Sequence, residues 1–355
     1  MPDNRETTHY EVAIIGGGPA GLQTALYTAR LGHDTVVFDR GGGRAAMMLD
    51  THNVIGVEEH VSGNEFLQTA QEQVTAYGAD VIRELITDAE RTEGGWFHLA
   101  GGEHAVTADA VVLGMGFTDG RPEPPVPRTG RGLHWCLHCD AYMFIDRPVY
   151  VMGAGESAAK VAMIMLNFTD RVDILLRGEQ PTWSDETAAQ LAAHPVEVIP
   201  AEITGMQKDA EGWLTAYEFD DGQTRHYRGG FPMYGSEFNT ALAEQLGCAL
   251  TDDGGVVVDA DQQTSVDGVY AVGDLTPGNN QIPIAMGKGA TAGLAIHSRL
   301  RRFPRDPAEI AARGPVTPAE VPGLGDRIRA AADAFPEARA PPLPDPQEDA
   351  VPSDD

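Results

Sequence analysis

The sequence is poor in cysteine. Its 355 residues contain three, Cys136, Cys139 and Cys248, which are too few for a framework of disulfides. The fold therefore cannot depend on such a framework, and this usage is typical of a reducing compartment. We expect a cytoplasmic protein.

Long apolar segments are also absent. No stretch reaches the roughly 18 uninterrupted apolar residues of a membrane-spanning helix. The opening residues, "MPDNRETTHYEVAIIGGG", lack the basic region and apolar core of a secretory signal. We expect no membrane partner and no secretion. With 42% hydrophobic residues, a chain of this length should bury the cores of two domains.

Positive charge is scarce as well. There are 25 lysines and arginines against 53 acids, a formal net charge of -28, and only three of the bases are lysines. An acidic surface without a basic patch argues against nucleic acid as a partner. Because the acids are spread along the chain, one hypothesis is adaptation to a high-salt cytoplasm, where salt screens carboxylate repulsion. The alternative is an ordinary acidic protein from an arginine-rich genome.

A dinucleotide-binding pattern lies near the start of the chain. In "EVAIIGGGPAGLQTALYTARLGHDTVVFDR", an apolar strand from Val12 leads into a GxGxxG turn, a helix and a second strand that ends at an acid. The glycines allow close backbone approach, the helix start offers N–H groups to a pyrophosphate, and the acid suits a ribose. The predicted binding residues are Gly16, Gly18, Pro19, Ala20, Gly21 and Asp39.

The same pattern recurs in "RPVYVMGAGESAAKVAMIMLNFTDRVDILLRG", where a strand from Val149 to Met152 precedes a GxGxxA turn. This predicts a second nucleotide unit. An NAD site favours an acid where Arg177 stands, and an NADP site favours a basic cluster, so one arginine fits neither well. The residues predicted for a nicotinamide nucleotide are Gly153, Gly155, Glu156, Ser157, Ala158 and Arg177.

The stretch "HWCLHCD" places Cys136 and Cys139 three positions apart. Zinc needs about four ligands, and the chain offers one CxxC with His134 and His138 nearby, so we expect no metal. A structural disulfide across so short a loop would restrain little of the unfolded chain. The spacing favours reversible redox chemistry, in which one thiolate attacks and its neighbour resolves.

Four motifs, GxGxxG, CxxCD, GxGxxA and TSxxGVxAxGD, follow in this order from Val12 to Leu300. In order and spacing the chain resembles the low-molecular-weight thioredoxin reductases, which are FAD-dependent pyridine nucleotide-disulfide oxidoreductases. The resemblance implies an α/β fold with two Rossmann-like, three-layer nucleotide-binding domains, one discontinuous, and a homodimer. The expected divisions are 1–117 and 236–305 for the FAD domain, 118–235 for the pyridine-nucleotide and CxxC domain, and 306–355 for a largely disordered acidic tail. Within this tail, "GLGDRIRAAADAF" indicates a short amphipathic helix that docks on the body.

The resemblance also implies roles for single residues. Cys139 would lie against the flavin, Cys136 would attack the substrate disulfide, and Asp140 would donate and accept protons. The alternative for Asp140 is a solvated loop acid or a helix N-cap. Further FAD contacts are expected from Asn53, Gly273, Asp274, Gln281 and Ile282. Asn280 stands where the family has an arginine.

The implied activity is electron transfer from NAD(P)H through FAD to the cysteine pair, and on to a thioredoxin-like protein or a small disulfide or dithiol. The family's His-Arg-Arg run for NADPH is absent from "LLRGEQPTW". The donor is therefore NADPH held loosely by Arg177, NADH, or something else. Two kinds of relative, ferredoxin-linked reductases and oxygen-using dithiol oxidases, stay open, as does a non-catalytic redox sensor. Asp140 favours the reductase, because the oxidases usually carry histidine there.

Overall fold

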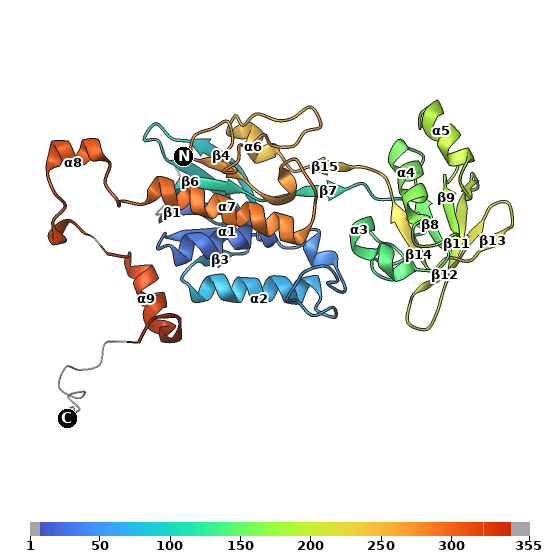
Figure 1. The fold of residues 1–355 in the computed structure, drawn as a ribbon, viewed down its shortest axis with the longest axis horizontal. Coiled ribbons are helices and arrows are strands. Elements are labelled where there is room, and N and C mark those ends of the chain that lie inside the picture. Colours follow the sequence, from blue (N-terminus) through green and yellow to red (C-terminus); the bar gives the residue numbers. More distant parts are fainter. Residues whose placement is uncertain (1–7, 322, 342–355) are drawn as a thin grey trace, which may run out of the picture.

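The computed structural model describes residues 8–321 and 323–341, which form two α/β bodies and a C-terminal extension (Figure 1). In the larger body, β3 (Asp80–Ile82), β2 (Thr35–Phe38), β1 (Thr8–Ile15) and β6 (Ala105–Leu113) are parallel neighbours. The antiparallel strands β5 (Phe97–Gly101) and β4 (Ile86–Arg91) continue this sheet, and β16 (Val269–Ala271) also pairs with β6. Strand β1 begins earlier than the predicted Val12, because its more exposed first residues also pair with β6.

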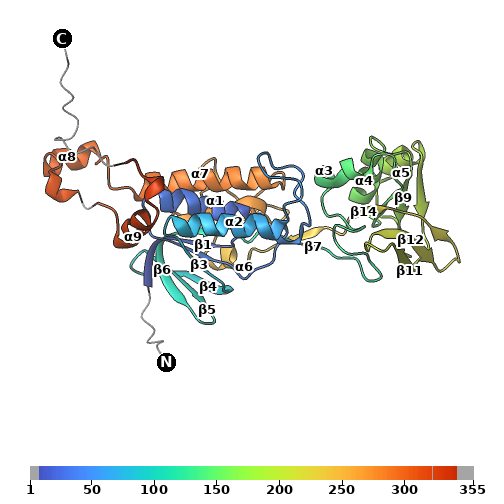
Figure 2. The ribbon, with the colours of Figure 1, turned by 90° about the horizontal axis from the view of Figure 1, so that it is seen from below.

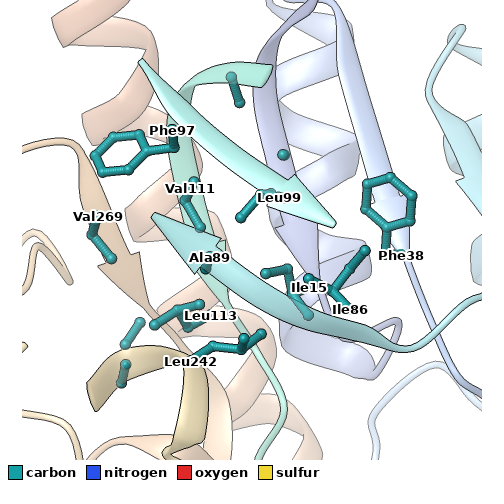
Figure 3. Close-up of a cluster of buried hydrophobic side chains, with 14 of the residues drawn as sticks. Ile15, Phe38, Ile86, Ala89, Phe97, Leu99, Val111, Leu113, Leu242 and Val269 are labelled. Carbon is teal, nitrogen blue, oxygen red and sulfur yellow. The ribbon is translucent and has the colours of Figure 1, made fainter. Parts of the chain in front are cut away.

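Helices cover one face of this sheet. Figure 2 shows α7 (Ile282–Leu300), α1 (Pro19–Arg30) and α2 (Gly63–Ala76) side by side. Glycines on α7 let it approach α1 closely, since a Cβ at Gly289 would overlap the carbonyl of Ala20. The Thr24 hydroxyl also donates to the Gly289 carbonyl over 3.1 Å. The opposite face buries the apolar cluster of Figure 3, which includes Phe38, Leu99, Val111, Leu113 and Leu242 of α6 (Ala241–Gln245).

The smaller body has a parallel sheet of β10 (Val196–Ile199), β9 (Val172–Leu175), β8 (Val149–Met152) and β14 (Gly229–Pro232), in that order. Strand β8 has the predicted bounds. Helices α4 (Glu156–Met165) and α5 (Asp185–Ala192) accompany it, with a second, antiparallel sheet of β11 (Ile203–Lys208), β12 (Leu214–Phe219) and β13 (Thr224–Arg225). The cysteine motif forms α3 (Leu137–Asp140), followed by η2 (Ala141–Phe144).

Two strands, β7 (Phe117–Asp119) and β15 (Ser236–Phe238), carry the chain between the bodies and pair antiparallel (Figure 1). The Phe117 and Phe238 rings meet edge to face, with centroids 6.1 Å apart. The sheet of the larger body therefore contains strands that precede the smaller body in the sequence and one strand, β16, that follows it. The predicted fold class, two Rossmann-like units of which the first is discontinuous, is confirmed.

The structure has the short helix expected in the tail, but it differs from the expectation that the tail is otherwise largely disordered. Residues up to 341 include α8 (Pro307–Arg313), η4 (Pro318–Glu320), α9 (Asp326–Ala334) and η5 (Pro336–Ala338). Helix α9 buries Ile328 against the region of Gly78, and the Tyr77 and Phe335 rings meet with centroids 5.6 Å apart. Apolar side chains between the charges thus dock this segment on the larger body. The acidic end from 342 lies outside the described residues. In the described part of the chain, every helix is too short or too polar to cross a membrane.

Candidate disulfide and cofactor site

A cavity of about 690 Å³ lies where the larger body meets the cysteine motif. Its size is within the range of small-molecule and cofactor sites. It brings together most of the predicted FAD and redox residues: Gly16, Gly18, Pro19, Ala20, Asp39, Asn53, Gly273, Asp274, Gln281, Ile282, Cys136, Cys139 and Asp140. Gly21 is not on the wall but beneath it, where a Cβ would overlap the carbonyl of Gly16.

The turn between β1 and α1 fits the pyrophosphate half of a dinucleotide. Gly16 has a φ of 109°, and a Cβ there would overlap the carbonyl of Gly114. Helix α1 starts after Gly18 with no side-chain cap and no acid in its first turn, so its first N–H groups are free for an anion. Asp39, at the end of β2, accepts a hydrogen bond from the Gly17 N–H over 3.2 Å. The geometry of this turn fits the pyrophosphate of FAD, and the contact of Asp39 with the adenosine ribose stays a prediction.

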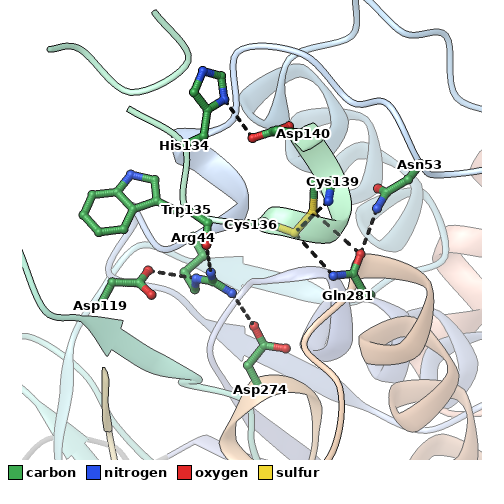
Figure 4. Close-up of a disulfide and its surroundings, with 10 residues drawn as sticks. All are labelled: Arg44, Asn53, Asp119, His134, Trp135, Cys136, Cys139, Asp140, Asp274 and Gln281. Atoms are coloured by element: carbon green, nitrogen blue, oxygen red, sulfur yellow. Dashed lines mark hydrogen bonds and ion pairs between the residues drawn. A yellow bond between two sulfur atoms is a disulfide. The ribbon is translucent and has the colours of Figure 1, made fainter. Parts of the chain in front are cut away.

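A charged cluster lies beside the disulfide, with Arg44 and Asp274 in the cavity wall (Figure 4). Arg44 donates from Nε to Asp119 over 2.8 Å, and its Nη1 lies 3.6 Å from Asp274. Burial raises the pKa of Asp274, although Arg44 and Lys288 oppose that shift. Arg44 was not predicted from the sequence. The feature that could have indicated it is its position directly after three glycines, in "GGGR". Nη2 of Arg44 also donates to the carbonyl of Trp135 over 3.4 Å, which links the larger body to the cysteine loop.

The cysteines form a disulfide against the start of α7 (Figure 4). Gln281, the residue before this helix, donates from Nε2 to the Sγ of Cys136 over 3.4 Å, and its Oε1 lies 3.7 Å from the Sγ of Cys139. Asn53 donates to the same Oε1 over 2.8 Å. Because α7 has no acid in its first turn, its positive end is open toward the cavity. Asn53 and Gln281, distant in sequence, thus hold the disulfide in place together.

Asp140 is paired with a buried histidine. Its Oδ2 lies 2.9 Å from Nδ1 of His134, whose ring is 3% exposed. The Asp140 side chain makes no capping bond to the helix turn that follows it, so the N-cap alternative is not supported. Sequence reasoning weighed His134 only as a zinc ligand and missed this pair.

The second nucleotide unit stands apart from the cavity, since none of its predicted residues lines the wall. Gly153 has a φ of 139°, and α4 starts after Gly155 without a side-chain cap, as a pyrophosphate turn requires. Glu156 in its first turn accepts hydrogen bonds from the Ser184 N–H over 3.1 Å and the Thr187 hydroxyl over 2.5 Å. The predicted Ser157 and Ala158 follow within the same helix.

Arg177, the predicted phosphate contact, is committed to the protein. It donates to the carbonyl of Pro124 over 3.4 Å, and its Nε is buried without a partner among the described residues. The next residue, Gly178, lies against the carboxylate of Glu202. The loop after β9 therefore carries one arginine that is bonded within the protein, and it lies against an acid that follows β10, rather than presenting a basic cluster.

Comparison with known proteins agrees with this geometry. Residues 10–289 match the family of pyridine nucleotide-disulphide oxidoreductases. The chain is 28% identical to a thioredoxin reductase of Helicobacter pylori over 82% of this chain and 98% of that one. It is 31% identical to an NADH dehydrogenase of Bacillus subtilis over 82% of this chain, but it spans only 59% of that relative.

Among solved structures, the thioredoxin reductase of Streptococcus pyogenes superposes with a TM-score of 0.76 at 25% identity, covering 84% of this chain and all of that one. The family match, the disulfide and the cavity beside it point to one chemistry. The chain belongs to the pyridine nucleotide-disulphide oxidoreductase family and is an FAD-dependent, thioredoxin reductase-like thiol-disulfide oxidoreductase.

Proposed function

We propose that the protein passes electrons from a nicotinamide nucleotide to the Cys136–Cys139 pair, and from there to the disulfide of a thioredoxin-like protein in the cytoplasm. The observation that carries this proposal is the disulfide in the wall of the FAD-sized cavity, bonded to Gln281. FAD, when bound, supplies two-electron transfer between a nicotinamide and a disulfide. The protein works as a homodimer, as the resemblance to the reductases implies.

The cysteines have separate roles in this proposal. Cys139 exchanges electrons with the cofactor, and Cys136 attacks the partner's disulfide. Asp140 accepts the proton of a cysteine thiol and returns it during exchange. Support comes from the position of Asp140, whose carboxylate directly follows Cys139 and lies in the same cavity wall.

Hydride delivery requires the smaller body to turn against the larger one. The GxGxxA turn is not part of the cavity wall, so a nucleotide bound there does not share the cavity in this arrangement. The strands β7 and β15 form the hinge in this proposal. This rotation of the smaller body would break the hydrogen bond from Arg44 to the Trp135 carbonyl.

The preferred donor is NADH. The loop after β9 lacks free positive charge for a 2′-phosphate, because Arg177 is held by Pro124 and Glu202 lies beside Gly178. A carboxylate repels a phosphate and is compatible with a ribose hydroxyl. We expect kcat/KM for NADH to exceed that for NADPH by about tenfold, or about 1.4 kcal/mol.

The test is an anaerobic titration of the yellow protein in molar KCl, with NADH and NADPH separately, followed by addition of oxidised thioredoxin. Bleaching of the flavin by NADH, then formation of thioredoxin thiols, is the expected result. Cys136→Ser should still bleach but reduce no thioredoxin, whereas Cys248→Ser, at a buried site outside the cavity wall, should behave as wild type. A Cys136→Ser variant that reduces thioredoxin at the wild-type rate would refute the proposal.

A second candidate is an enzyme that runs without NAD(P)H, either an oxygen-using dithiol oxidase or a ferredoxin-linked reductase. The absence of a basic cluster after β9, where Arg177 donates to the Pro124 carbonyl, is compatible with this candidate as well as with NADH. In that case neither nucleotide bleaches the flavin while dithiothreitol does so through the cysteines. If the protein binds FAD but shows no turnover with any pair of donor and acceptor, it is a redox sensor.

A further inference from the structure

His134 is a buried side chain in the cysteine loop for which the functions above have no use. Its backbone N–H donates to the carbonyl of Gly230 over 2.9 Å, which fixes the residue at the edge of β14. Nδ1 of the ring lies 2.9 Å from Oδ2 of Asp140. Nε2 is buried and has no hydrogen-bond partner among the described residues. The imidazole is therefore bonded to a single group, the carboxylate that follows Cys139 (Figure 4).

Aromatic rings enclose the imidazole on its other sides. Phe144 meets it edge-on with centroids 5.0 Å apart, and Trp213 stacks on it with an interplanar angle of 22°. Phe231 completes the enclosure, at 6.2 Å. The ring orientation is thus set by packing, and the direction of Nδ1 toward Asp140 follows from it.

Charged side chains lie against the ring of Trp213. The guanidinium groups of Arg131 and Arg228 lie over the Trp213 ring at 5.0 and 4.8 Å, and Asp209 pairs with Arg228 over 2.7 Å. Since Nδ1 of His134 faces a carboxylate oxygen, which accepts, Nδ1 carries a hydrogen and donates to Oδ2 of Asp140.

We infer that His134 is a positioning residue for proton exchange at the cysteine pair: its Nδ1–H fixes Oδ2 of Asp140 and leaves Oδ1 for a thiol proton. The inference rests on the acid–base role proposed for Asp140. Among the described residues Oδ1 has no hydrogen-bond partner, and the carboxylate lies in the cavity wall.

Protons and electrons balance in this exchange. In the mixed disulfide between Cys136 and a partner, the Cys139 thiol gives its proton to Oδ1 and its sulfur attacks the sulfur of Cys136. The Cys136–Cys139 bond forms, the bond from Cys136 to the partner breaks, and the departing thiolate takes the proton from Oδ1. Two electrons pass from the enzyme's dithiol, which is oxidised, to the partner's disulfide, which is reduced.

The test measures reduction of the enzyme's own disulfide by dithiothreitol, a reaction that needs no turnover. The full-length holoprotein is mixed with dithiothreitol in molar KCl, quenched with an alkylating reagent and analysed by mass spectrometry between about pH 3 and pH 9, a range that spans the ordinary aspartate pKa. Rates are divided by the concentration of dithiothreitol thiolate. In this direction Asp140 is the acid, so the corrected rate should fall above a midpoint that Asp140→Asn abolishes.

Four variants separate positioning from simple packing. His134→Phe keeps the aromatic enclosure but removes the donor that stabilises the carboxylate, so the midpoint should move up by about one pH unit. His134→Asn keeps an N–H near the place of Nδ1 and should keep the wild-type midpoint. His138→Phe, at the exposed histidine of the same motif, is the matched control and should change nothing. The double variant His134→Phe/Asp140→Asn should equal Asp140→Asn alone, because both act through one group.

Two results overturn the inference while the proposed function stands. One is a His134→Phe variant that keeps the wild-type pH midpoint while Asp140→Asn has no midpoint. This result would count even if the melting temperature of His134→Phe is lower than that of the wild type. The other is additive losses in the double variant. If Asp140→Asn itself keeps the pH dependence, the acid–base role of Asp140 fails and the inference fails with it. The Cys136→Ser test of disulfide transfer is independent of both.

Discussion

Gly16 and Gly18 stand two residues apart in one turn, yet a methyl group would meet different surroundings at each. At Gly16 the backbone is left-handed, with a φ of 109°, and the methyl would overlap the carbonyl of Gly114. At Gly18 φ is -77°, and nothing described lies within 4 Å of an added Cβ. Gly16 is therefore required by the fold, whereas nothing in the described protein requires Gly18, and we propose that the bound cofactor does.

We expect Gly16→Ala to lower the stability of the FAD-free protein by about 1–3 kcal/mol, the usual cost of such backbone strain. Gly18→Ala should leave that stability unchanged within about 0.5 kcal/mol. It should still weaken FAD binding about tenfold or more, since the methyl enters the space of the pyrophosphate. Urea unfolding of the FAD-free proteins and FAD titration would measure both. Equal FAD affinity in Gly18→Ala and wild type would contradict the assignment of this turn.

Asp274 gives the site a pH dependence. Burial raises the pKa of this carboxyl, against the opposing effects of Arg44 and Lys288. The folded state therefore keeps the proton to a higher pH than the unfolded chain does. Stability of the FAD-free protein should fall as pH rises from the ordinary aspartate pKa of about 3.9 through the raised value, and stay lower above it.

Asp274→Asn cannot lose a proton, so its unfolding free energy should lack that fall and exceed the wild-type value at neutral pH. The same variant should bind FAD about tenfold more weakly, because a charged hydrogen-bonding partner of the cofactor is gone. Thermal unfolding of the FAD-free proteins between pH 4 and 8, beside FAD titration at pH 7, would test both effects. Asp119→Asn is a useful comparison, since that acid also contacts Arg44. A wild-type pH profile in Asp274→Asn would rule out Asp274 as the source of the fall.

At the scale of elements, local patterns predicted the parts that one segment builds alone. The glycine turn before α1, the acid at the end of β2 and strand β8 each depend on a short run of sequence, and the structure has them there. His134 and Asp140 lie in one seven-residue stretch, but their pairing was still missed, because the orientation of the imidazole depends on rings from elsewhere in the chain. The ring that stacks on His134 is Trp213, which comes from the turn between β11 and β12 far along the chain.

The C-terminal extension was predicted in part, since α9 lies in the stretch that indicated a short amphipathic helix. Its composition predicted disorder, because proline and acids dominate the average over the segment. Helix α9 nevertheless carries one buried side chain, Ile328, and Arg327 pairs with Asp80 at the end of the sheet. A few contacts with a surface that is already folded are enough to order a short amphipathic helix. The composition of a segment indicates whether that segment can form a hydrophobic core by itself. The C-terminal extension instead packs against the larger body, which is already folded.

At the scale of the whole molecule, charge is the dominant feature. With 53 acids and 25 lysines and arginines, ion pairing cannot neutralise more than half of the carboxylates. Pairs such as Arg225 with Glu197, at 2.7 Å, are on the surface and contribute little each. The unpaired carboxylates repel one another over roughly the Debye length, which is about 10 Å at 0.1 M salt and about 3 Å at 1 M. Folding concentrates these charges, so repulsion opposes the folded state most strongly at low salt.

The melting temperature should therefore rise by roughly 5 °C or more between 0.1 M and 2 M KCl, with most of the gain below 1 M, where the Debye length changes most. Sucrose is the control, because it favours the compact state by exclusion from the surface without screening charge. If screening is the cause, sucrose at a matched water activity should reproduce only a small part of the gain. A melting temperature that is independent of KCl would instead mean that the acids are far enough apart for water alone to suppress their repulsion, and the high-salt hypothesis would be wrong.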